Sequence, residues 1–449
     1  MTNDSLRDYL VKKLDGERAT MTEMEGLYLG TSPLAFIDPA TLRALDNRVK
    51  PLPINLCRLA VDVLAQRCQV AGFRSSPGDV VDNMLVALWK SLGLPASSAL
   101  AQLDALVYGR SYFLAWAGSR GEPIVTAESP LQFTVTRDPI TREVVGALKR
   151  WRDPDGYTRS MVITADTVTE YASRHAAPTD EFMRAALPLA GEDNVLAGQE
   201  PNALGRVPVV ALVNRPRLAA PDGESDLSDL SAPVKAISKL ASDLMVSSEY
   251  ASIPRRWMTV SASMSPEQAQ EAQEALARSA ASPNASRFTV VGGSGNEQAR
   301  VGTFDTAELS NFRAAIELLV DQVAALASLP PYYVRGGTAN PQSADAIRSS
   351  EARLTAKARQ RAAWWGPAYA DLMRLAVTIR DGYEDPRLTD LETLWVDPEP
   401  ATDAQTADAV SKTYGANIID RRTALTELGL SPLEIERNLS TPTEIGAIA

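Results

Sequence analysis

The most regular hydrophobic pattern of the chain lies in its second half. Two segments repeat apolar residues at alternating spacings of three and four, which places those side chains along one stripe of an α-helix. The first stripe comprises Leu227, Leu230, Val234, Ile237, Ala241 and Leu244, and the second comprises Leu309, Phe312, Ile316, Leu319, Val323 and Leu326. We therefore predict two amphipathic helices, each with an apolar seam that packs against a neighbour.

A third long helix is predicted after a loop. The proline pair at 330–331 stops the second helix, because proline lacks the amide donor and restricts the residue before it. A polar, glycine-containing loop follows over residues 335–342, and the third helix covers residues 343–381. Gly366 and Pro367 interrupt that helix, so we expect a kink there.

The first half of the chain changes from helical to β-type patterns at Gly109. Helices are predicted at 55–70, ended by Gly72, and at 80–92 and 97–108. Short β-type runs divided by turn residues then follow. The candidate strands are Tyr112 to Trp116, Ile124 to Ala127, Phe133 to Thr136, Val144 to Trp151, Ser160 to Ile163, and one more after Gly205. The polar segment 176–201 is predicted to be a loop.

The segment between the two seamed helices contains a small α/β module. It has a strand at 256–260, a helix at 265–280, and two runs, 287–291 and 300–304, that are predicted to form a hairpin around glycines. Two short helices, at 403–412 and 420–428, are expected near the C-terminus. The predicted fold class is α+β and rich in helix.

Composition restricts the classes of function. The 449 residues exceed a single compact core, so two or three domains are expected. The net charge of −11 argues against a protein that grips duplex DNA tightly, since such proteins neutralise phosphates with basic residues. Cys57 and Cys68 lie roughly 16 Å apart along a predicted helix, too far for a disulfide, and are expected to be buried thiols of a reducing cytoplasm. With no signal peptide and no apolar run that spans a bilayer, we expect a soluble intracellular protein without a membrane partner.

The usual catalytic motifs are absent from the sequence. It contains no Walker-type phosphate loop, HExxH, GxSxG or paired CxxC motif. The single histidine, His175, lies in a polar segment and is expected at the surface. No catalytic residue, cofactor or metal ligand is therefore predicted.

Three groups of residues carry weaker functional signals. Tyr332, Tyr333 and Arg335 follow the proline pair, where they could either contact nucleic acid or pack locally. The residues Arg353, Lys357 and Arg361 share one helix face, which is either solvated and ion-paired or a contact with DNA or another subunit. The run Arg255, Arg256 and Trp257 is either an interface anchor or ordinary packing.

Several collinear stretches resemble bacteriophage portal proteins, specifically the SPP1-portal-like group of actinobacteriophages. The stretches are NLCRLAVDVLAQRCQVAGFR from Asn55, DALVYGRSYFLAW from Asp104, GRVPVVALVNRP from Gly205, SDLSDLSAPVKAISKLASDLMVSSEYASIPRRW from Ser225, ANPQSADAIRSSEARLTAKARQ from Ala339 and IIDRRTALTELGLSPLEIE from Ile418. The resemblance covers nearly the whole chain.

The resemblance implies a division of the chain into the parts of a portal protein. These parts are a wing at 1–221, a first stem helix at 222–252, a clip at 253–304, a second stem helix at 305–329, a tunnel loop at 330–342, a kinked wing helix and return at 343–396, and a crown at 397–449. By this resemblance Tyr332, Tyr333, Arg335, Asn340 and Gln342 face DNA, and Arg255, Arg256 and Trp257 belong to the clip surface that meets partners.

The implied function is a ring, usually of twelve subunits, at one capsid vertex, through which double-stranded DNA is packaged and ejected. The implied partners are copies of the chain, the DNA, the terminase large subunit, a head-completion adaptor, and the major capsid and scaffold proteins. The ring would be assembled in the host bacterial cytoplasm and belong to the virion. An acidic tunnel wall would repel phosphates and favour sliding; lysines in place of its carboxylates should then slow packaging. The alternatives are another virion structural or adaptor protein, which the helix–module–helix order disfavours, and an enzyme with an unrecognised site.

Overall fold

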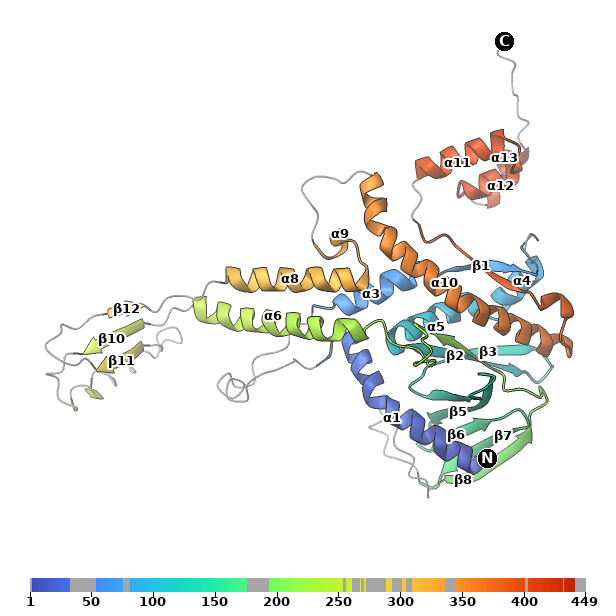
Figure 1. Ribbon diagram of the computed structural model, residues 1–449, viewed down its shortest axis with the longest axis horizontal. Helices are drawn as coiled ribbons and strands as arrows, with labels where there is room; N and C mark the ends of the chain where they lie inside the picture. Colours follow the sequence, from blue (N-terminus) through green and yellow to red (C-terminus); the bar gives the residue numbers. More distant parts are fainter. Residues whose placement is uncertain are drawn as a thin grey trace, which may run out of the picture.

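The computed structural model describes most of the chain. The described residues are 2–32, 54–75, 81–175, 194–252, 256–260, 288–292, 301–303, 309–335, 344–399, 403–430 and 432–440, together with residues 267, 270 and 271. A body of helices and sheets carries a projecting helical hairpin on one side and a small helical unit at the C-terminus (Figure 1).

Two antiparallel sheets form the β-rich part of the body. The three-stranded sheet has the order β3-β2-β9 and the five-stranded sheet has the order β4-β5-β6-β7-β8. Their bounds are β2 Arg110–Ala117, β3 Pro123–Glu128, β4 Phe133–Arg137, β5 Val144–Arg152, β6 Thr158–Ile163, β7 Thr167–Ser173, β8 Asn194–Pro201 and β9 Val209–Val213. The predicted strands in this region are confirmed, but β7 was not predicted, and the prediction of a loop throughout 176–201 is wrong because β8 pairs with β7 along the edge of the sheet.

Alternation along the strands distributes side chains between two cores. Ala147 on β5 and Ile163 on β6 face the three-stranded sheet, whereas their neighbours Leu148 and Val162 face α1 (Asn3–Leu29). Successive side chains of a strand point to opposite faces, so one sheet supplies apolar surface to both layers. The sheet is consequently covered on one face by α1 and on the other by the three-stranded sheet (Figure 1).

The main core lies around a long helix, α10 (Ala344–Asp381). It packs with α3 (Leu56–Ala65), β2 and β9, and Gln102 of α5 (Leu94–Tyr108) donates to the hydroxyl of its Tyr369; α4 (Asn83–Ser91) lies against α5. Trp365 and Tyr369 of α10 are fully buried in this core. The 3-10 turn η3 (Pro386–Leu388) and strand β13 (Glu392–Trp395) return the chain alongside α10.

The prediction of a helix from 55 to 70 is wrong at its C-terminal end. α3 ends at Ala65, and Gly72 lies within a strand, β1 (Val70–Arg74), which pairs with β13. This pairing between distant segments buries Phe73 and outweighs the local helical pattern. Cys57 and Cys68 are both buried and free, as predicted, although only Cys57 lies on the helix.

The two seamed segments form an antiparallel hairpin. The 3-10 turn η2 (Ser228–Leu230) leads into α6 (Ser231–Ser252), and α8 (Ser310–Ala327) packs alongside α6 (Figure 1). α8 ends before the proline pair, at Ser328, whose φ of 62° makes it a left-handed C-cap. The short helix α9 (Pro331–Val334) follows, so the described start of the predicted loop is one helical turn.

A three-stranded sheet lies at the far end of the hairpin (Figure 1). It consists of β10 (Arg256–Val260), β11 (Phe288–Gly292) and β12 (Val301–Thr303) in the order β11-β10-β12. The predicted hairpin between the last two strands is wrong, because β10 lies between them, parallel to β11 and antiparallel to β12. The helix predicted at 265–280 lies almost wholly outside the described residues.

The C-terminal unit contains three short helices. They are α11 (Asp403–Gly415), α12 (Arg421–Glu427) and α13 (Pro432–Ser440), and their buried apolar side chains include Val410, Ala424 and Ile435 respectively. The Asp420 carboxylate accepts a hydrogen bond from the Thr423 amide at 3.0 Å and so caps α12. Two of these helices were predicted; α13 was not.

Candidate functional site: the helical hairpin and the segment after it

The seam of the hairpin is buried at its root and only half-buried further out, except that Leu326 at the root, which was predicted to belong to the seam, is 53% exposed. Leu230 on η2, Val234 and Ile237 on α6, and Val323 on α8 are at most 6% exposed. The predicted seam residues beyond them, Leu244, Leu309, Phe312, Ile316 and Leu319, are partly exposed. The root therefore joins the core of the body, whereas the outer half of the hairpin leaves apolar surface accessible.

Three large apolar side chains on the hairpin are exposed. Met245 on α6 is 59% exposed, and Leu318 and Leu326 on α8 are 62% and 53% exposed. The surface ion pairs beside them are solvent-accessible, such as Arg313 with Glu317 at 2.7 Å. Large exposed apolar residues gathered on a projecting element are typical of surfaces that other protein chains cover.

A buried ionic cluster anchors the root of the hairpin to α10. Asp226, which is 8% exposed, receives Arg361 at 2.8 Å and Lys357 at 3.0 Å, and the Asn214 amide lies 3.2 Å from the same carboxylate. Burial raises the pKa of Asp226, but the two cations and the hydrogen bonds together lower it by more than burial raises it. The pKa of Asp226 therefore lies below the ordinary value. The carboxylate is therefore ionised at neutral pH.

This cluster shows how two of the three cations on the predicted basic face of α10 are used within the chain. Arg361 is 2% exposed and stacks over Trp364 at 4.7 Å, so Arg361 and Lys357 are ion-paired within the chain. Arg353 of the same predicted face is exposed.

The segment after the proline pair is held by side-chain contacts. The rings of Tyr332 and Tyr333 stack at 4.9 Å between centroids, and both side chains are half-buried. The Tyr332 hydroxyl donates to Glu351 of α10, and Arg67 donates to the Tyr333 hydroxyl at 3.3 Å. Both tyrosines thus make local contacts within the protomer, and their contact with DNA stays a prediction.

Arg335 differs from the two tyrosines because it is exposed. Its guanidinium makes a bidentate pair with the Asp321 carboxylate on α8, with Nε 2.8 Å from Oδ1. Asn340 and Gln342, which were also predicted to face DNA, lie outside the described residues.

The remaining predicted positions stay predictions. α10 continues through Gly366 and Pro367, and Thr393 donates to the Gly366 carbonyl at 2.9 Å. Figure 1 shows the axis of α10 changing direction along its length, and the role of these two residues in that bend is untested. Arg256 and Trp257 lie in β10 and Arg255 lies outside the described residues, so the structure does not define their side-chain contacts.

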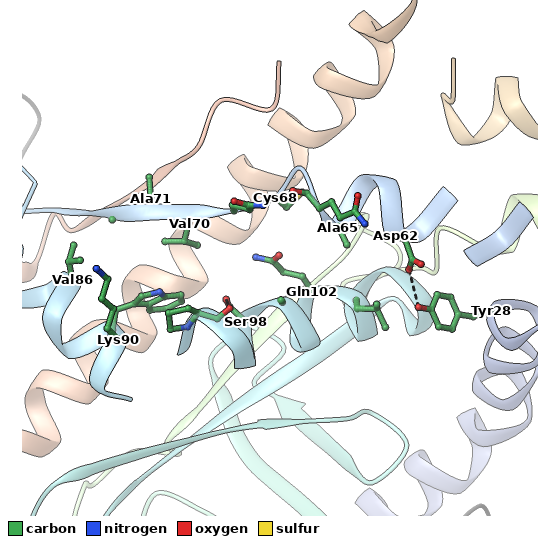
Figure 2. Close-up of a pocket in the computed structure, with 17 residues that line it drawn as sticks. Tyr28, Asp62, Ala65, Cys68, Val70, Ala71, Val86, Lys90, Ser98 and Gln102 are labelled. Carbon is green, nitrogen blue, oxygen red and sulfur yellow. Dashed lines mark hydrogen bonds between the residues drawn. The ribbon is translucent and has the colours of Figure 1, made fainter. Parts of the chain in front are cut away.

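The body also contains a groove of about 690 Å³ between α3, β1, α4 and α5. Figure 2 shows its lining, where the Tyr28 hydroxyl donates to Asp62 at 2.9 Å. Cys68 borders the groove, and burial raises the pKa of its thiol to about 12, which makes it a poor nucleophile at neutral pH. Within the described residues no His, Cys, Asp and Glu side chains gather in a group that could hold a metal ion.

No single described helix is long and apolar enough to cross a bilayer, and α4 with α5, bent by 74°, satisfies that criterion only as a pair. His175 is exposed, as predicted.

The described part of the chain thus combines a projecting two-helix hairpin, a small sheet at its far end and a long helix, α10, behind its root. Residues 8–431 match the family described as phage portal protein, SPP1 Gp6-like. The chain belongs to this family.

Similar proteins agree with that assignment. The portal protein of Mycobacterium phage D29 is 31% identical over 398 residues, which cover 84% of this chain and 76% of the relative. The portal protein of Mycobacterium phage L5 is 31% identical over 401 residues, with the same coverage. Portal proteins are structural components of the virion that work as oligomeric rings, so the chain is assigned to a virion ring.

Two solved structures resemble the fold at low identity. A chain of the virion of a native gene transfer agent particle has 13% identity and a TM-score of 0.45, covering 89% of this chain and 95% of that one. A chain from the neck of the native particle, computed with C12 symmetry, has 12% identity and a TM-score of 0.41, covering 89% and 96%.

Sequence reasoning missed the residues that anchor the site. Asp226 lies just before the first seam, Arg67 lies in the turn after α3 and Glu351 lies on α10, and neither of the last two has a distinguishing spacing in the sequence. The signal in the sequence that could have pointed to such an anchor is a charged residue within an otherwise apolar helix face. Glu351, three residues before the apolar Leu354, gives this signal only weakly.

Proposed function

We propose that copies of this chain form a ring at one capsid vertex, usually of twelve subunits, through which double-stranded DNA enters and leaves the capsid. The observation that carries the proposal is the hairpin of α6 and α8, which stands out from the body with exposed Met245, Leu318 and Leu326. A head-to-tail ring covers such side chains with the next copy at every position, since each subunit offers one face and receives another.

The assigned parts follow the family. The hairpin is the stem, the β10–β12 sheet belongs to the clip, residues 330–342 form the tunnel loop, and residues 397–449 form the crown. The clip, including Arg255, Arg256 and Trp257, meets the terminase large subunit and later a head-completion adaptor. The major capsid and scaffold proteins surround the ring, which assembles in the host cytoplasm. The chain itself catalyses no reaction; ATP hydrolysis belongs to the motor.

The base of the tunnel loop supports sliding of DNA. Arg335, an exposed cation of this segment, already has Asp321 as a bidentate partner. A guanidinium neutralised in this way gains less from a phosphate than a free one, because binding would have to replace an existing pair. The overall charge of −11 supports the same behaviour.

Microscopy of the purified protein tests the ring directly. Negative-stain images should show rings with a central hole. Monomers, together with measurable turnover of a substrate, would contradict the proposal and favour an enzyme.

Packaging assays test the assignment of the loop. Arg335→Ala should leave ring assembly intact and lower the amount of packaged DNA several-fold, because the start of the loop then loses the ion pair that holds it to Asp321 of α8. The matched control is Arg313→Ala. It breaks the exposed pair of Arg313 with Glu317, which lies on α8, the helix that also carries Asp321, but outside the loop. Normal packaging by Arg335→Ala would refute the tunnel position of this side chain.

A further inference from the structure

A side-chain cluster outside the hairpin joins four segments that are distant in the sequence. Arg67, which follows α3, lies at its centre. Its guanidinium is 3.2 Å from the Glu351 carboxylate of α10, donates to the Tyr333 hydroxyl of α9 at 3.3 Å, and donates to the Pro398 carbonyl at 2.8 Å. Pro398 lies between β13 and α11, in the connection to the C-terminal helices.

The carboxylate of Glu351 completes the cluster. The oxygen that faces Arg67 also accepts from the Tyr332 hydroxyl, and the two tyrosine rings stack on each other. Both tyrosines at the start of the tunnel loop are therefore bound to one ion pair.

Burial makes the cluster sensitive to the loss of any member. Glu351 is 4% exposed, and the Arg67 side chain is 13% exposed. Burial lowers the pKa of Arg67, but the Tyr333 hydroxyl and the Glu351 charge together raise it by more than burial lowers it. The guanidinium therefore stays charged. A buried charge that loses one partner is left incompletely satisfied, so its remaining contacts rearrange.

The geometry of guanidinium suits this position. Separate nitrogens of the planar group reach the Pro398 carbonyl and the Glu351–Tyr333 pair at the same time. An ammonium presents a single point charge on a flexible stem and does not reproduce this fork.

We propose that Arg67 is a positioning residue that couples the start of the tunnel loop to the linker of the crown. A displacement of Tyr333 changes the position of the guanidinium, and the same group holds the Pro398 carbonyl, so the two segments respond together although neither touches the other through this cluster. This coupling within one chain is separate from ring formation and from the passage of DNA. The coupling itself does not depend on the proposed function, whereas its use in a portal ring does.

Hydrogen exchange of the full-length protein tests the coupling. The Tyr333→Phe variant removes one hydroxyl and leaves Pro398 untouched. It should accelerate exchange several-fold at the Arg335 amide, which bonds to the Pro331 carbonyl in α9, and also at the Val396 and Glu399 amides of the crown linker. Unchanged exchange at the linker would overturn the proposal.

Two further variants separate coupling from general loosening. Arg335→Gln breaks the pair with Asp321 beside α9 without touching the cluster, so it should accelerate exchange in α9 and leave the linker at the wild-type rate. An equal effect on the linker would mean that any disturbance of α9 spreads, which contradicts a specific role of Arg67. In Arg67→Lys, the exchange rate in α9 should stay closer to the wild-type rate than the exchange rate in the linker does. Wild-type exchange rates in both segments would also contradict the proposal.

The experiment does not depend on the proposed function. Exchange is measured on the protein in its native state of assembly, whatever that state is. If the exchange is coupled but no rings form, only the proposed function is refuted. If rings form but the exchange of the two segments is not coupled, only the role of Arg67 is refuted.

Discussion

The root and the outer half of the hairpin are built from the same repeat of apolar residues but are stabilised differently. At the root, Ile237 and Val323 are fully buried, and Asp226 joins the hairpin to α10 through two cations. In the outer half, Leu244 and Phe312 are half-buried, and ion pairs such as Arg313 with Glu317 are exposed. The root packs on the body, whereas the outer half has only the facing helix.

This difference indicates which contacts belong to the folding of one chain and which to assembly. Burial of apolar surface contributes about 25 cal/mol per Å², so the root is strongly held within the protomer. In the proposed ring, the outer half gains the same contribution when another copy covers it. Substitutions in the two regions should therefore separate stability from assembly.

The largest effect on the protomer is expected from Asp226→Asn. It leaves Lys357 and Arg361 buried without a counter-charge, at a cost of about 3–5 kcal/mol in the free energy of unfolding. Denaturant titration of the protein would measure it. The matched control is Asp229→Asn, whose exposed pair with Arg215 should contribute at most about 1 kcal/mol. Equal effects of the two variants would refute the distinction.

The pH dependence of the same pair of proteins gives an independent check. Because the folded-state pKa of Asp226 is lowered, its stabilisation is present above the unfolded-state pKa of about 3.9 and is lost as the pH falls through the lower folded value. The stability difference between wild type and Asp226→Asn should therefore be constant near neutrality and shrink below about pH 4. A difference that grows on acidification would contradict this assignment.

The next largest effect is expected from truncation of the seam. Ile237→Ala removes a fully buried side chain and should cost about 2–5 kcal/mol of unfolding free energy. Leu244→Ala removes a similar volume from a half-buried site and should cost about 1–2 kcal/mol in the protomer. Unfolding measured under conditions that keep the protein monomeric tests the order, and a reversed order would show that the outer half carries the fold.

The smallest effect on the protomer is expected from Leu318→Ser. This exposed side chain makes little contribution within one chain, so the unfolding free energy should change by about 0.5 kcal/mol or less. Its effect should appear in assembly, as a shift from rings to smaller species in size-exclusion chromatography with light scattering. Arg313→Ala, on the same helix, should leave the distribution unchanged. Rings of normal yield from Leu318→Ser would exclude this face from the interface.

The elements that depend on local pattern could be predicted from the sequence. The seams of the hairpin repeat at the helical period, and Asp420 is a capping residue placed directly before a helix. The strands of the body are short runs of β-type residues divided by turn residues, which is how most of them were recognised. The family resemblance identified the class of protein from collinear stretches of sequence.

Only the tertiary structure decided the pairings between distant segments. The position of β10 between β11 and β12, and the pairing of β1 with β13, follow from contacts that no local window contains. The same holds for Asp226 with Arg361 and for Arg67 with Glu351 and Pro398, since a charged residue in a sequence is ordinarily solvated and becomes a buried partner only when the fold removes its water. Helical and strand periodicity are properties of neighbouring residues, so the sequence determined the two helices of the hairpin. Burial and ion pairing are properties of the folded chain, so the packing of those helices and the anchors of the hairpin and of the loop required the structure.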